Sequence, residues 1–214
     1  MDGMLAWQIC NETVPDFDTA NVEFDKIWDL IRSSEKTYIL LNYVSSQKEN
    51  MTIFIINKHT LQIDEFKFRC CIGKRGSTFK KIEGDNKTPK GLFKIENLYF
   101  RKDRINKPKT SLKCVKINHD MGWCNDVRFP QKYNKLIKRE KKYRHEKLKR
   151  KDYKYDLFIP IKYNFKKPVA GKGSCIFLHL TKNYKPTTGC IALKVKDFLI
   201  MLRLIKKNSI IKII

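Results

Sequence analysis

The sequence predicts a mainly β or α+β single domain. Short β-rich apolar runs recur along the chain, polar and glycine- or proline-containing segments separate them, and strands do not alternate with helices as in βαβ units. At 214 residues the chain is long enough for one core of ordinary size, and a hydrophobic fraction of 42% argues against global disorder. The sequence contains no internal repeats.

Residues 1–35 are expected to form an N-terminal extension to a domain of residues 36–214. Asp18 and Thr19 are suited to cap a short helix. The apolar residues that follow have the spacing of one helix face: Phe24, Ile27, Trp28 and Ile31.

From Tyr38 the pattern changes to strands. Residues 37–46 and 51–60 are β-rich runs separated by the polar turn QKEN. In residues 62–73 apolar and polar positions alternate, as expected for a half-buried strand. The apolar positions of this run are Phe66, Phe68, Cys70 and Ile72.

Residues 73–95 read as a glycine-punctuated loop until a strand resumes at Leu92–Ile95. The glycine spacing is not that of a GxxxxGK[ST] phosphate loop. Residues 131–155 are densely basic, and two interpretations remain open for them. They form either a solvated helical or irregular face, or a patch that binds a polyanion.

The C-terminal third contains two apolar runs, residues 155–165 and 174–180, that are bounded by turn signals. Both are predicted to be buried strands. Val195–Lys207 has helical periodicity through Phe198, Leu199, Leu202 and Ile205, and residues 209–214 form a last predicted strand.

The charge is unusual, because 46 Lys and Arg against 22 Asp and Glu give a net charge of +24. Such an excess favours a polyanionic partner, for example nucleic acid, an anionic membrane surface or an acidic polymer. The chain is also rich in Ile and Asn, which share AT-rich codons with Lys. Charge alone therefore does not identify a partner.

Seven cysteines without CxxC pairs or a Cys/His cluster predict neither a disulfide framework nor a structural zinc site. The N-terminus lacks the pattern of a signal peptide, and no segment approaches the roughly 20 apolar residues of a membrane span. Taken literally, the sequence predicts a soluble cytoplasmic protein.

His179 and Cys190 are the candidate catalytic residues. His179 ends an apolar run, and Cys190 follows a glycine between a polar loop and another apolar run. A cysteine on a tight glycine turn, served by an imidazole, is an arrangement suited to nucleophilic catalysis. Spacing alone leaves a second interpretation open, in which both are ordinary core residues.

The segment from His179 to Cys190 resembles the signature of the L,D-transpeptidase catalytic domain (the YkuD fold), in which a histidine precedes an [ST]-x-G-C element. EGDNKTPKGLFKI resembles the family's D-x-x-TP-x-G-x-F element. Further blocks resemble a subgroup with GWC(N/D)D and PTxGC(I/V)AL elements. Five blocks keep the same order over about residues 70–200, and residues 1–35 are not covered.

The resemblance implies a mixed β-sandwich with a C-terminal helix. It also implies that Cys190 is the nucleophile and His179 the general base. Gly189 matches the turn glycine that shapes the oxyanion pocket, and Thr188 the small hydroxyl or histidine position before it. No metal or cofactor is implied.

Two departures concern substrate recognition. The commonest family pattern has Ser-His before Gly-Cys and an Arg or Asn two residues after the cysteine, where this chain has Thr187-Thr188 and Ala192. The gap between His179 and Cys190 is also shorter. The contact that Arg or Asn provides must come from elsewhere, or the donor substrate is held differently.

Trp123, Tyr133 and Asn134 match further subgroup blocks. They are either a packed aromatic cluster with a turn or a wall of the substrate groove, with Asn134 offering an amide to a peptide. Lys87, Thr88 and Pro89 are expected to build a loop rather than to touch substrate.

The implied activity is cysteine-dependent peptidoglycan transpeptidation, with possible carboxypeptidase side activity. Stem peptides would be donor and acceptor, and no obligate protein partner is inferred. The family implies a location in the cell envelope or periplasm, which conflicts with the missing signal peptide. Two alternatives remain: a basic nucleic-acid-binding module, and a non-catalytic relative that binds the cell wall.

Overall fold

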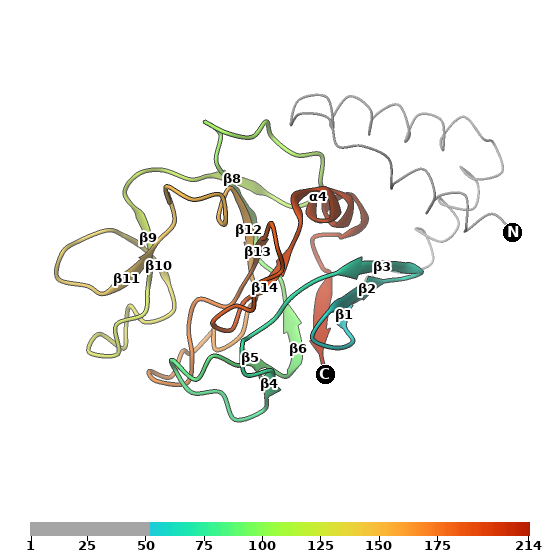
Figure 1. The fold of residues 1–214 in the computed structure, drawn as a ribbon. Helices are drawn as coiled ribbons and strands as arrows, with labels where there is room; N and C mark the ends of the chain where they lie inside the picture. The colour runs from blue at the N-terminus through green and yellow to red at the C-terminus, as the bar shows by residue number, and fades with distance from the viewer. Residues whose placement is uncertain (1–51) are drawn as a thin grey trace, which may run out of the picture. The chain divides into compact units, whose positions relative to one another are not determined.

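The computed structural model describes residues 52–214, which belong to one compact unit, Asn50–Ile214. The predicted N-terminal helix and the predicted strand at 37–46 lie outside the described residues. The described part contains fifteen strands and one α-helix (Figure 1). The first eight strands are β1 (Thr52–Ile55), β2 (Thr60–Ile63), β3 (Phe66–Arg69), β4 (Ser77–Thr78), β5 (Thr88–Pro89), β6 (Gly91–Lys94), β7 (Leu98–Phe100) and β8 (Cys114–Lys116). The remaining elements are β9 (Met121–Cys124), β10 (Leu136–Lys138), β11 (His145–Lys147), β12 (Leu157–Pro160), β13 (Phe177–Leu180), β14 (Ile191–Leu193), α4 (Val195–Leu204) and β15 (Ile210–Ile213).

Two five-stranded sheets form a mixed β-sandwich. One has the order β3-β2-β1-β15-β6 and the other the order β14-β13-β12-β7-β8. Parallel pairs, β1 with β15 and β13 with β14, occur among antiparallel ones. Residues from both sheets share one core, for example Ile53 and Ile211 from the first and Leu157 and Leu178 from the second. The predicted fold class, mainly β with a C-terminal helix, is confirmed.

The second sheet is buried on both faces at its β12-β13-β14 end. Side chains alternate along these strands, so that Leu157 and Leu178 enter the sandwich core while Phe158 and Phe177 point to the opposite face. This two-sided burial explains why the strands read as nearly continuous apolar runs in the sequence. The prediction of buried strands in residues 155–165 and 174–180 is confirmed.

A small antiparallel sheet, ordered β10-β9-β11, stands apart from the two larger sheets in Figure 1. Trp123 of β9 and Leu148, just after β11, pack in one cluster with Phe158 and Phe177 of the second sheet. This small sheet therefore covers the face of the second sheet that the sandwich core leaves free. It holds much of the basic stretch 131–155, which forms two short strands and turns rather than a helix.

Helix α4 completes the sandwich core with Phe198, Met201 and Leu202, whose spacing follows one helix face. Asp197 lies in the first turn, where a carboxylate interacts favourably with the helix dipole. The helix ends at Leu204, earlier than the predicted Lys207, because Ile205 is already extended. In the described part of the chain, no helix is long and apolar enough to cross a membrane.

The predicted half-buried strand at 62–73 is interrupted by a turn at Asp64, which has a φ of 48°. The segment therefore forms a hairpin of β2 and β3. Phe68 is buried as expected, whereas Phe66 is 45% exposed on the edge strand.

Strand β15 lies inside its sheet, between β1 and β6, so its core-facing side chains should contribute strongly to stability. Ile211 is fully buried, whereas Ile214, just beyond the strand, is 52% exposed. We expect Ile211→Ala to lower the free energy of unfolding by about 2–5 kcal/mol in urea titrations. The matched variant Ile214→Ala should change it by less than about 0.5 kcal/mol, and equal effects would contradict the assigned core.

Candidate active site

His179 and Cys190 lie on the same face of the second sheet. In the parallel pair of β13 and β14, Leu178 is opposite Ile191 and His179 is opposite Ala192. Cys190 precedes β14 by one residue, so its side chain shares the face of Ala192 and His179. Strand spacing places the two Cα atoms about 8 Å apart, within the reach of an imidazole.

The hydrogen bond of His179 determines its tautomer. Nδ1 lies 2.9 Å from the carbonyl oxygen of Leu180. A carbonyl can only accept, so Nδ1 carries the proton and Nε2 is left as the basic nitrogen. The ring of Tyr155 packs edge-on against the imidazole, with the centroids 5.6 Å apart. His179 therefore has the tautomer in which Nε2 can act as a base.

The Cys190 thiol is held by backbone groups of the neighbouring chain. Its S–H donates to the carbonyl oxygen of Cys175 at 3.1 Å, and its sulfur accepts from the N–H of Phe177 at 3.4 Å. Cys190 and His179 are each only 7% exposed. The Cys190 sulfur is therefore shielded from solvent in this conformation.

Burial keeps both groups uncharged. Desolvation raises the pKa of the Cys190 thiol to about 12, with a smaller lowering effect from the Phe177 N–H. Desolvation lowers the pKa of His179 to about 4, opposed by its bond to Leu180. At neutral pH the pair is therefore a thiol and a neutral imidazole rather than a thiolate–imidazolium ion pair.

The turn before Cys190 needs a glycine. Gly189 has a φ of 143°, and a Cβ there would lie 3.0 Å from the carbonyl oxygen of Lys87. The hydroxyl of Thr187 donates to the carbonyl of Cys190 at 2.6 Å and accepts from the N–H of Gly189 at 3.1 Å. Thr187 thus closes the turn, while the side chain of Thr188 is exposed beside it.

Thr88 attaches the upstream loop to this turn. Its hydroxyl donates to the carbonyl of Gly189 at 2.8 Å and accepts from the N–H of Gly73 at 2.9 Å. Thr88 is fully buried. The sequence indicated a loop-building role, but it carried no sign that the loop is bonded directly to the turn before Cys190.

Trp123, Tyr133 and Asn134 lie in the interior, with exposed fractions of 2%, 0% and 4%. The amide oxygen of Asn134 accepts from the indole N–H of Trp123 at 2.9 Å and from the N–H of Cys175 at 3.1 Å. The structure thus places the three residues as a packed support behind Cys175 rather than with faces open to a groove. Asn134 positions the residue whose carbonyl holds the Cys190 thiol.

A second support was not anticipated from the sequence. The hydroxyls of Tyr133 and Ser174 both donate hydrogen bonds to Oε2 of Glu83, and the bond from Ser174 is 2.7 Å long. Burial and this carboxylate together raise the pKa of Tyr133 above its usual range. Glu83 therefore ties the 81–85 loop to the segment just before Cys175.

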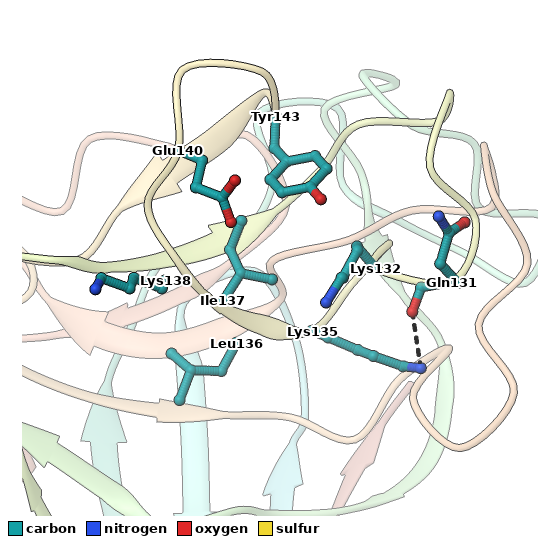
Figure 2. Close-up of a pocket in the computed structure, with 8 residues that line it drawn as sticks. All are labelled: Gln131, Lys132, Lys135, Leu136, Ile137, Lys138, Glu140 and Tyr143. Atoms are coloured by element: carbon teal, nitrogen blue, oxygen red, sulfur yellow. Dashed lines mark hydrogen bonds between the residues drawn. The ribbon is translucent and has the colours of Figure 1, made fainter.

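The basic stretch borders a cavity of about 390 Å³ on the small sheet (Figure 2). Its lining residues are Gln131, Lys132, Lys135, Leu136, Ile137, Lys138, Glu140 and Tyr143. A second cavity of about 550 Å³ borders β2 and β3. Neither is lined by Cys190 or His179. Among residues 52–214, no three His, Cys, Asp or Glu side chains gather as metal ligands.

The protonated state of Cys190 can be tested by ultraviolet thiolate absorbance. Wild type and Cys190→Ala should have the same absorbance from about pH 6 to about pH 9, because the thiol pKa lies well above this range. Urea-unfolded wild type, in which all thiols titrate normally, serves as the control. A Cys190-dependent step near the ordinary thiol pKa would refute the protonated resting state.

The bridging role of Thr88 predicts a loss of stability in Thr88→Val, which keeps the shape and removes the hydroxyl. The N–H of Gly73 and the carbonyl of Gly189 would stay buried without this partner. Each should lower the free energy of unfolding, measured in urea titrations, by about 1–3 kcal/mol. Thr88→Ser should recover most of the loss. In the control Thr78→Val the lost bond is exposed, and an equal effect of both valine variants would argue against the bridge.

Comparisons with known proteins found one similar solved structure and one matching family model. A solved structure of Bdellovibrio bacteriovorus Bd1075 is similar at 16% identity and a TM-score of 0.40, over 79% of this chain and 49% of that one. The chain thus spans about half the length of that protein. No curated protein matches the chain. The family model of the YkuD L,D-transpeptidase catalytic domain matches residues 37–213, and the chain therefore belongs to this family.

Proposed function

We propose that the protein is a cysteine-dependent L,D-transpeptidase that acylates Cys190 with a peptidoglycan stem peptide. Membership of the YkuD family supports action on peptidoglycan peptides. The observation that carries the assignment of residues is the β13–β14 register, which places Cys190 and a tautomerically defined His179 on one face. No metal or cofactor enters the proposed chemistry.

In the first half-reaction, Nε2 of His179 removes the thiol proton as Cys190 attacks the donor carbonyl. Because both groups are uncharged at rest, proton transfer accompanies the attack instead of preceding it. The S–H must first rotate away from the carbonyl of Cys175. A C–S bond forms, the C–N bond breaks, and the imidazolium returns the proton to the leaving amine.

The developing oxyanion requires backbone N–H donors at the turn, for which we propose Gly189 and Cys190. The N–H of Gly189 donates to the hydroxyl of Thr187 at rest. It therefore has to exchange this partner for the oxyanion. Thr188 is exposed next to this donor and is proposed to border the same pocket.

In the second half-reaction, an amine of a neighbouring stem or a water molecule resolves the thioester. Attack by an amine yields a cross-link or an exchanged stem, and attack by water yields a shortened stem. Cys190 and His179 are nearly buried, so the peptide reaches the sulfur only after covering side chains move. Gating of this kind is common where a reaction must exclude bulk water.

We propose the cell envelope as the place of action, as the substrate requires. Stem peptides and associated wall polymers are anionic, and the charge of +24 attracts such a polymer over long range. The lysines around the cavity in Figure 2 also support the alternative of nucleic-acid binding. That alternative predicts salt-sensitive binding that survives Cys190→Ala.

The test is intact-mass measurement after incubation with a carbapenem, which acylates the nucleophile of this family. Wild type should gain one adduct, and Cys190→Ala none. His179→Gln should slow the acylation by about 10²–10⁴-fold, because the base is lost.

Cys114→Ala is the control. Because Cys114 lies on β8, this substitution should leave the adduct unchanged. An adduct that persists in Cys190→Ala would refute the assignment of the nucleophile. A wild type without any adduct would leave the non-catalytic, wall-binding alternative.

A further inference from the structure

One charged pair lies beside both catalytic residues, and the chemistry of acylation does not use it. Glu146 is opposite Trp123 in the register of β11 and β9, so the two side chains share a face of the small sheet. The indole of Trp123 packs edge-on against Phe177 at 5.3 Å, and the N–H of Phe177 bonds to the Cys190 sulfur. Glu146 therefore borders the nucleophile's side of the site.

The partner of Glu146 leads to the general base. Nη1 of Arg150 donates to Oε1 of Glu146 at 2.6 Å. The guanidinium lies over the ring of Tyr155 at 5.0 Å, and Tyr155 packs against His179. Two hydrogen bonds of 2.8 Å to Asp152 fix the guanidinium in place. Arg150 is thus held in place by Asp152 and Glu146.

The pair is accessible where the catalytic residues are not. The side chains of Glu146 and Arg150 are 29% and 30% exposed, against 7% for Cys190 and His179. Arg150 engages one of the two carboxylate oxygens. Glu146 therefore offers a carboxylate to a molecule that approaches the site.

A negative charge at this place opposes the first half-reaction. The field of Glu146 contributes to the raised pKa of the Cys190 thiol, and it acts in the same direction on Cys175 and Tyr155. Glu83, the carboxylate on the other side of Cys175, is occupied by two hydroxyls. Two roles are open to Glu146. In a purely structural role it only anchors Arg150, and in a functional role its carboxylate binds a cation.

We propose that Glu146 binds the protonated amine of the acceptor peptide and positions it for attack on the thioester at Cys190. This inference rests on the proposed transpeptidase function and specifies one of its substrate contacts. Before it reacts, the acceptor amine is a primary ammonium at neutral pH, and a carboxylate is a natural partner for that cation. Arg150 is the positioning residue that holds Glu146.

The bound ammonium loses one proton to solvent and becomes the neutral nucleophile. Its nitrogen attacks the thioester carbon, the N–C bond forms and the C–S bond breaks. Nε2 of His179 takes a second proton from the nitrogen and passes it to the departing sulfur. The products are an amide and the free Cys190 thiol, so atoms and charges balance.

The decisive variant is Glu146→Gln, which keeps an oxygen for Arg150 and removes the charge. The assay supplies a stem tetrapeptide as donor and a stem tripeptide with a free side-chain amine as acceptor, and measures the ratio of transfer to hydrolysis. Loss of a charge-assisted contact should lower this ratio about tenfold to hundredfold. The rate of carbapenem acylation should change far less than the ratio.

Three comparisons separate recognition from a structural role. Glu146→Asp should recover part of the transfer, and an acceptor with an N-acetylated amine should not be used by any variant. Glu140→Gln, in an exposed Glu–Lys pair in the connection between β10 and β11, should leave the ratio unchanged. An equal loss of acylation and transfer in Glu146→Gln would support mere anchoring and overturn the proposal.

The outcomes also separate this proposal from the proposed function. If wild type forms no Cys190-dependent carbapenem adduct, the transpeptidase assignment fails and the inference fails with it. If the adduct forms but Glu146→Gln transfers as well as wild type, only the role of Glu146 is overturned. A wild type that forms the adduct and transfers nothing to the free amine overturns it as well.

Discussion

The parallel pairing of β13 with β14 is the constraint on which the rest of the site depends. Leu178 and Ile191 enter the sandwich core, so His179 and Cys190 must emerge on the opposite face. A slip by one residue would exchange the two faces and place polar groups in the core. Burial of the apolar face of these strands thus fixes the face on which the proposed catalytic residues lie.

Covering that face has an electrostatic consequence. The small sheet supplies Trp123 and Leu148, which exclude water and favour the neutral forms of Cys190 and His179. A thiol without charge is protected from oxidation and alkylation, which require the thiolate. In the proposed mechanism, the same burial means that Cys190 becomes reactive only when substrate binds, through movement of the covering side chains and proton transfer during attack. Protection and activation therefore depend on one set of contacts.

The sequence predicted the strands around the site well, because two-sided burial leaves continuous apolar runs such as residues 174–180. It could not predict the pairing partners, which depend on contacts distant along the chain, as between Thr88 and Gly189. The buried position of Asn134 was equally hidden, since a packed amide and a substrate-facing amide have the same local sequence. Glu146 gave no signal of its own, because it is one of a few acidic residues within a densely basic stretch.

Position 192 shows why substrate recognition has to come from a different element in this chain. The commonest family pattern has Arg or Asn there, but Ala192 is fully buried opposite His179. Its N–H and carbonyl are both bonded to Cys71, at 2.8 and 2.9 Å, so its backbone is not available either. Strand β14, which follows the proposed nucleophile, therefore offers no charged or polar group to a substrate at this point. Charge near these residues comes instead from side chains outside β13 and β14, among them Glu146 of β11 and Arg150 just after that strand.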